Sequence, residues 1–121
     1  MNPWLVAAAL AAFATFVIHT VVGGRLIAGP LLAARDLARV PRLTAYYCWH
    51  MVTILLLAMT FALAWAARYA NPPLVALVLL LAIAFTVLSL ALVIAYQVRP
   101  WHLPQWALFL IVAVLSGLGL A

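Results

Sequence analysis

The chain has 121 residues, of which 72% are hydrophobic and 6% are charged. A water-soluble globule needs far more surface charge than the six basic and one acidic side chains present, so this composition excludes that class and predicts an integral membrane protein. The formal net charge of +5 would indicate nucleic acid as a partner of a soluble protein. In a membrane protein it favours contact with anionic lipid, so we expect the lipid bilayer as a partner and no nucleic acid.

Four apolar segments meet or approach the length of about 20 helical residues that a bilayer crossing takes. They run approximately over residues 4–23, 44–68, 74–98 and 105–121. We therefore predict an all-α, polytopic membrane protein. Its architecture is expected to be a single up-down bundle of four transmembrane helices, which forms one domain over residues 1–121.

Glycine and proline delimit these segments in chain order. Gly23 and Gly24 weaken helix continuation, so we expect the first helix to end there. Pro30 suits the first position of a helix, which predicts a short interfacial helix over residues 30–40. The prolines within 71–73 and 100–104 lack a backbone donor and restrict the residues before them, which predicts short connections at both places.

Small and hydroxyl-bearing residues mark the helix faces that we expect to point inward, because they permit close packing in lipid. On the second predicted helix this stripe consists of Tyr46, His50, Thr53, Leu57, Thr60 and Ala64. On the third it consists of Ala82, Thr86, Ser89, Val93 and Gln97. The fourth has the pair Ala113 and Gly117, which also permits close contact between copies in a homo-oligomer.

The arginines divide unevenly between the two ends of the predicted bundle. Arg68 is alone at one end, and the other five lie beside the opposite helix ends: Arg25, Arg35, Arg39, Arg42 and Arg99. Basic residues are retained on the cytoplasmic side of a membrane. We therefore predict a bacterial inner-membrane protein whose arginine-bearing connections face the cytoplasm and whose two termini lie outside it.

The three histidines are all expected near the arginine-bearing end. Ionisable groups within membrane segments are costly, so they are functional hypotheses by default. Aromatic residues gather at the same level, where their rings favour the headgroup region. These residue types together predict a cytoplasm-facing ligand-binding cluster made of His19, His50, His102, Arg25, Arg99, Tyr46, Tyr47, Trp49 and Trp101.

Several ligands are compatible with this cluster. Haem would use a histidine as axial ligand, arginines for its propionates and the aromatic residues for its apolar body. A quinone or a lipid would use the same pocket without iron. A metal ion held by His19, His50 and His102 is a further alternative, although the segments contain no carboxylate and the local charge is already positive.

Two other functions explain the same residues. An oligomeric transporter or channel subunit would use Thr53, Thr60, Thr86 and Ser89 to line a polar path, although proton-coupled transport often uses intramembrane carboxylates, which this chain lacks. A structural or assembly protein would need no ligand site, because hydroxyls and small residues are common at helix contacts. The chain has no phosphate-binding loop and no paired carboxylates, and the sequence leaves open whether it is an enzyme.

Overall fold

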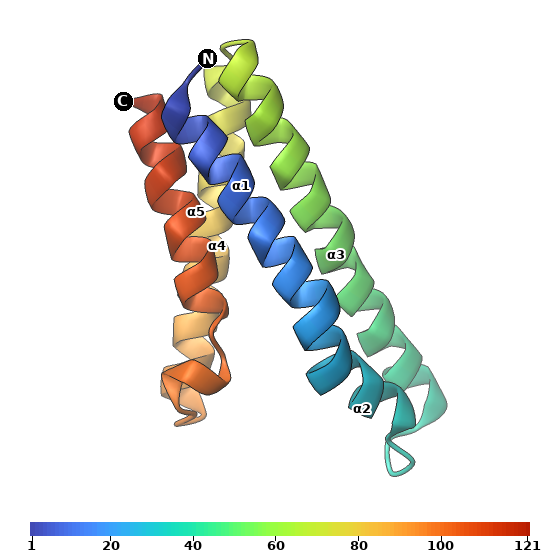
Figure 1. Cartoon of the computed structure of the whole chain (residues 1–121). Helices are drawn as coiled ribbons and strands as arrows, with labels where there is room; N and C mark the ends of the chain where they lie inside the picture. The colour runs from blue at the N-terminus through green and yellow to red at the C-terminus, as the bar shows by residue number, and fades with distance from the viewer.

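Four long helical segments run alternately in opposite directions (Figure 1). The structure, a computed structural model, describes all residues from Met1 to Ala121. It is all-α, with elements α1 (Pro3–Val17), the π-helical η1 (Ile18–Ala28), α2 (Gly29–Ala33), α3 (Arg39–Arg68), α4 (Pro72–Ala95), the 3-10 turn η2 (Pro100–His102) and α5 (Gln105–Leu120). Three segments are long and apolar enough to cross a membrane: Pro3–Ala33, Arg39–Arg68 and Pro72–Ala95. The fourth, α5, is a shorter apolar helix.

The first helical segment continues through Gly23 and Gly24, which corrects the end predicted from these glycines. Here the helix widens to π spacing, and the N–H of Gly29 donates to the carbonyl of Gly24. Continuation has a physical reason, because backbone groups in lipid must be satisfied within the segment. One consequence is that Arg25 lies on a helix and not in a loop.

The connection between α2 and α3 also differs from the prediction. Instead of one helix over residues 30–40, α2 ends at Ala33, residues 34–38 are not helical, and α3 begins at Arg39. Pro41 is accommodated in its first turn, where no intrahelical N–H bond is lost. Arg42 donates from Nη1 to the carbonyl of Ala34 at 2.7 Å, which closes the connection against the start of α3.

The end of α4 is set by a left-handed residue, Gln97, whose φ is 51°. The N–H of Gln97 donates to the carbonyl of Ile94 at 3.4 Å, and that of Val98 donates to Val93 at 3.1 Å. These two bonds satisfy carbonyls that the last turn leaves free. The helix therefore ends at Ala95, three residues before the predicted end at 98.

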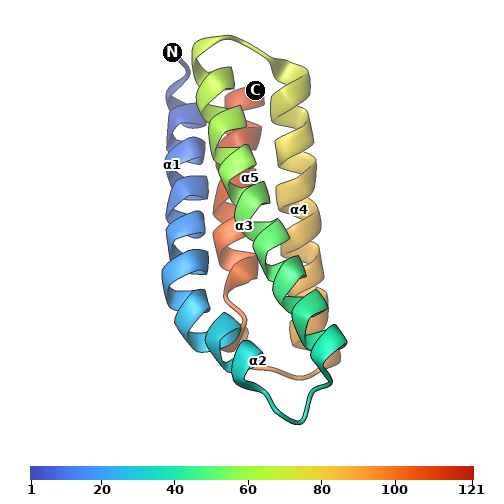
Figure 2. The same cartoon turned by 90° about the vertical axis from the view of Figure 1, so that its right-hand side faces the viewer.

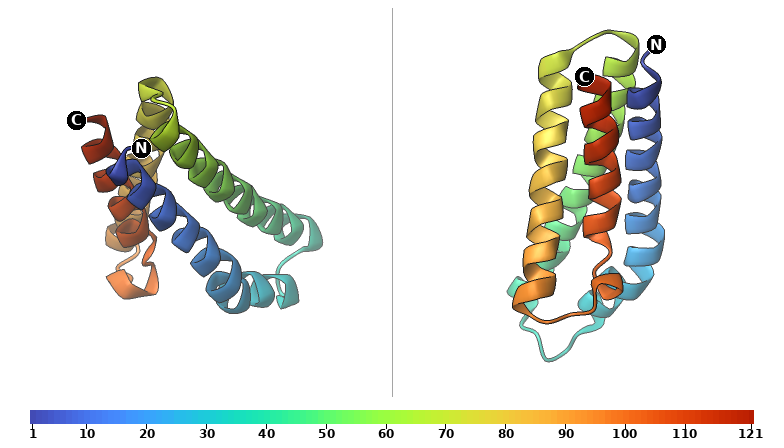
Figure 3. Two further views of the ribbon diagram at one scale, coloured as in Figure 1. Left: turned by 45° about the horizontal axis from the view of Figure 1, so that its top comes forward. Right: turned by 90° about the vertical axis from the view of Figure 1, so that its left-hand side faces the viewer.

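The helices associate as two antiparallel pairs, α1 with α3 and α4 with α5. Figure 1 and the left view of Figure 3 show that the pairs lie together near the chain termini and separate toward the other end. The buried apolar residues follow this shape, since most belong to the terminal half of the bundle: Leu5, Ala8, Ala12, Leu56, Met59, Leu63, Val75, Val78 and Val112. Alanines on α1 permit this close approach.

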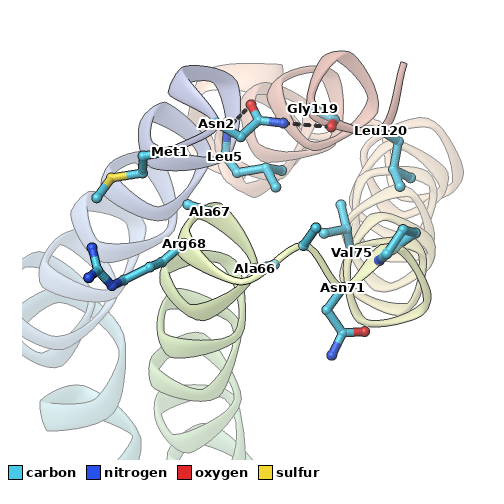
Figure 4. Close-up of a pocket in the computed structure, with 12 residues that line it drawn as sticks. Met1, Asn2, Leu5, Ala66, Ala67, Arg68, Asn71, Val75, Gly119 and Leu120 are labelled. Carbon is cyan, nitrogen blue, oxygen red and sulfur yellow. Dashed lines mark hydrogen bonds between the residues drawn. The ribbon is translucent and has the colours of Figure 1, made fainter.

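Both chain termini lie at the closed end of the bundle (Figure 2), and there Asn2 joins three helices (Figure 4). Its side-chain oxygen accepts from the N–H groups of Trp4 at 3.0 Å and Leu5 at 3.3 Å, which caps α1. Its Nδ2 donates to the carbonyl of Gly119 at 2.9 Å, and its backbone N–H donates to that of Ala67 at 2.9 Å. The start of α1 is thus bonded to the ends of α3 and α5.

Candidate functional site

The separation of the two helix pairs leaves a cavity of about 460 Å³, which we call the main cavity. It lies between η1 and α3 on one side and η2 with α5 on the other. Its walls are largely apolar and include Ile18, Val22, Val52, Leu56, Leu108 and Phe109. The polar side chains on the lining are few: Thr15, His19, His102 and Gln105.

The imidazole of His19 stacks on the indole of Trp49, with ring centroids 4.0 Å apart and planes 17° from parallel. Nε2 of His19 lies 3.0 Å from Oγ1 of Thr53 and 3.3 Å from the carbonyl oxygen of Trp49. A carbonyl can only accept, so we assign the proton of a neutral ring to Nε2. Nδ1 then carries a lone pair, and neither hydrogen bond of the side chain uses it.

Gly23 makes room for this stack. A Cβ at Gly23 would lie 2.6 Å from Cη2 and 2.9 Å from Cζ2 of Trp49. Gly23 follows His19 by about one turn of the wide helix, so both residues meet the same indole. The ring of Trp49 therefore contacts the imidazole of His19 on one turn of η1 and the backbone at Gly23 on the next turn. π-helical turns often occur where side chains need such unusual placement.

The opposite wall depends on Trp106. Its indole Nε1 donates to the carbonyl of Pro100 at 3.0 Å, and its backbone N–H donates to Oγ of Ser89 at 3.1 Å. These bonds hold η2 against the ends of α4 and α5. Trp101 and His102, which belong to η2, line the main cavity.

The structure divides the residues of the predicted cluster into two groups. His19, Trp49, Trp101 and His102 all line the main cavity. The others do not: His50, Tyr46, Tyr47, Arg25 and Arg99. The ring of His50 is exposed and packs edge-on against Tyr46, with centroids 4.6 Å apart. Because successive residues of a helix differ by about 100° in direction, a cavity-facing Trp49 turns its neighbour His50 away.

The histidines do not form the predicted set of metal ligands. No three histidine, cysteine or acidic side chains lie close enough together to hold a metal ion. The rotation of α3 accounts for this, since His50 does not share the cavity that His19 and His102 line. The cavity therefore presents aromatic and apolar surface rather than a coordination centre.

The hydroxyls of the predicted polar path are bonded to backbone groups. Thr60 donates to the carbonyl of Leu56 at 2.8 Å, and Thr86 donates to that of Ala82 at 2.7 Å. Ser89 accepts from the backbone of α5. This is the bonding expected of hydroxyls that serve helix packing.

A second cavity of about 250 Å³, the side cavity, adjoins the main one. Its own walls are Phe85, Leu88, Ser89 and Leu92 from α4, with Leu103 from the following connection. Five residues line both cavities: His19, Trp49, Val52, Gln105 and Phe109. The His19–Trp49 stack is thus part of a boundary between two spaces.

A third cavity of about 300 Å³ lies at the closed end of the bundle (Figure 4). Its polar side chains already have partners within the protein. Asn2 caps α1, and Asn71 caps α4 by accepting from the N–H of Leu74 at 3.3 Å. The guanidinium of Arg68 lies 5.7 Å from the ring centroid of Tyr69. We regard these groups as structural.

Sequence reasoning missed most residues that line the main cavity, Gly23, Gln105 and Phe109 among them. Gly23 was expected only to end a helix, whereas it admits the ring of Trp49. Gln105 and Phe109 line both cavities from α5, and their spacing of four residues on a helix was the one signal that they share a face.

Comparison with known proteins identifies no relative. No protein-family model matches the chain, and neither the curated proteins nor the solved structures contain a match to it. The functional interpretation therefore depends on the geometry of the cavities and on the distribution of charge.

Proposed function

We propose that the protein is a small integral membrane protein that binds an apolar ligand with an acidic head group in the main cavity. The observation that carries this proposal is the His19–Trp49 stack, which lines a largely apolar space and is held in place by the hydrogen bonds of His19 to α3. Ligand pockets commonly enclose about 300–1,000 Å³ and combine apolar walls with a few polar groups. The main cavity has this size and character.

The charge near the cavity supports an acidic head group. Arg25 follows the cavity-lining Gly23 by two residues, and Arg99 precedes η2 by one. Both side chains are exposed, and the arginine fork pairs well with phosphate or carboxylate. In this proposal the arginines meet the head group outside the cavity, while its walls hold the apolar body.

The orientation in the membrane is part of the proposal. All four long helical segments cross the bilayer, the arginine-bearing end faces the cytoplasm of a bacterial inner membrane, and both termini lie outside. The excess of arginine at one end supports this direction. At 1.5 Å per residue α5 spans about 24 Å, short of the hydrocarbon thickness of about 30 Å, so the bilayer thins locally around it.

A lipid or quinone fits this site better than haem. Nε2 of His19 is bonded to α3, and the ring lies flat on an indole. Only Nδ1, which is attached to Cγ and lies nearer the main chain than Nε2, is left to ligate an iron. Purified protein is therefore expected to show no Soret absorption, even after haem is supplied. A Soret band that disappears in His19→Ala would reverse this choice.

The experiment that tests the proposal compares two histidines. Protein purified in mild detergent is analysed by native mass spectrometry for retained small molecules. His19→Ala is expected to lose them, because the stack and its free nitrogen are removed. His50→Ala is the matched control and is expected to retain them, because His50 lines neither cavity. Equal retention by both variants and the parent protein would contradict the proposal.

A further inference from the structure

We infer that the ligand is an anionic phospholipid with two acyl chains, one on each side of the His19–Trp49 stack. This inference rests on the proposed function, because it specifies the molecule held at the same site. It depends on the shape of the main and side cavities as well as on the polarity of their walls.

The two cavities adjoin and have five lining residues in common. The main cavity extends toward α1 and η1, and the side cavity extends toward α4. They meet where His19, Trp49 and Val52 face Gln105 and Phe109 across the two helix pairs. A molecule seated at this junction reaches both spaces only if it has two branches. A single chain fills one space and leaves the other without apolar contacts.

The walls of both branches suit hydrocarbon. In the main cavity, Ile18, Val22 and Leu56 provide apolar surface, and in the side cavity Leu88 and Leu92 do the same. The polar side chains at the junction are His19 and Gln105. Of the two, the Gln105 amide can donate to an ester carbonyl of a phospholipid.

The charge at the open end selects an anionic head group. Five arginines belong to this end, against the single acid of the chain, Asp36. Neither a carboxylate nor an arginine lines either cavity, so the charges available to a phosphate lie outside the cavities, where the arginines of this end outnumber Asp36. A zwitterionic head group would gain less from the same arginines, since its cation would be repelled.

The first test uses defined lipids with the full-length protein in detergent, measured by native mass spectrometry. The probes are a diacyl phosphatidylglycerol, its single-chain lyso form and a diacyl phosphatidylcholine. We expect the first to bind about tenfold more tightly than either of the others, because burial of even two additional methylenes accounts for such a difference. Equal affinity for the lyso form would overturn the two-chain inference and leave the proposed function standing. Equal affinity for phosphatidylcholine would overturn the anionic head group.

The second test fills each branch separately. Val22→Trp narrows the main cavity and Leu92→Trp narrows the side cavity, and both positions are partly exposed, so a larger ring can be accommodated. The matched controls are Val21→Trp and Ile94→Trp, which alter exposed residues that line neither cavity. Only the two filling variants are expected to weaken binding of diacyl phosphatidylglycerol. In addition, Leu92→Trp should leave binding of the lyso form unchanged.

The results of the second test distinguish a failure of the two-chain inference from a failure of the proposed function. If Val22→Trp alone weakens diacyl binding, the ligand occupies one branch and the two-chain inference fails. If neither filling variant changes binding, the cavities are not the site and the proposed function fails with it. Thermal unfolding of each variant in detergent shows whether a loss of binding reflects a loss of fold.

Discussion

Gly23 shows how one missing side chain positions an aromatic ring. We predict that Gly23→Ala lowers the free energy of unfolding by about 1–3 kcal/mol, because the new methyl group overlaps Trp49. The displaced indole should also shift the tryptophan emission. Thermal unfolding in detergent, followed by fluorescence, measures both effects. Gly24→Ala is the control, since no atom lies within 4 Å of its added Cβ, and equal behaviour of the two variants would refute the argument.

Gln97 has a backbone conformation that is unfavourable for a residue with a Cβ atom. Its φ of 51° lies in the left-handed region, where glycine has no Cβ penalty. We predict that Gln97→Gly raises the free energy of unfolding by about 0.5–1 kcal/mol, as measured by chemical or thermal unfolding. Gln97→Ala should bring no such gain. A loss of stability in Gln97→Gly would show that the side chain itself stabilises the turn.

Among the elements, α1 depends on a cap that also crosses to a second helix. Asn2→Ala removes the acceptor for α1 and the donor to Gly119, and we expect a loss of about 1–2 kcal/mol in unfolding free energy. Asn2→Ser keeps a capping oxygen but cannot donate an amide hydrogen to Gly119, so its loss should be smaller. Hydrogen exchange of the α1 and α5 ends would localise the effect. Equal protection in all three proteins would count against the bridge.

The helices themselves were predictable from the sequence, whereas their rotation was predictable only in part. Four residues of the stripe predicted for α4 are buried, Ala82, Thr86, Ser89 and Val93, whereas the fifth, Gln97, is exposed and lies beyond the helix end. The stripe predicted for α3 was wrong, since His50 and Ala64 are exposed. The buried residues of α3 are instead mainly leucine, methionine and alanine. Lipid is as apolar as leucine, so an apolar residue gives no sign of which way it faces.

The sequence predicted at which end of the molecule the candidate site lies, but not which residues line it. Hydropathy and arginine placement put His19 and His102 near one end, and both line the main cavity. The cavity itself follows from the divergence of two helix pairs (Figure 3), which no local pattern records. Of the two adjacent predicted residues Trp49 and His50, only Trp49 lines the main cavity, because a shift of one residue on α3 changes the direction by about 100°.

For the whole molecule, the proposed orientation in the membrane can be tested by cysteine labelling. We expect a cysteine placed in the α2–α3 connection to react with a membrane-impermeant thiol reagent only from the cytoplasmic side. Ala38→Cys and Ala70→Cys, each combined with Cys48→Ser, report the two ends, and both alanines are exposed. In intact cells only Ala70→Cys should be labelled before the membrane is opened. Labelling of Ala38→Cys alone would reverse the orientation.

The bond between Asn2 and Gly119 joins residues 117 positions apart, and this separation bears on synthesis. Gly119 is synthesised 117 residues after Asn2, so the first helix cannot form this bond until α5 has been made. Nascent chains that stop before α5 lack both the Asn2–Gly119 hydrogen bond and the α5 residues that line the main cavity opposite η1. Binding at the proposed site therefore requires that α5 has been synthesised.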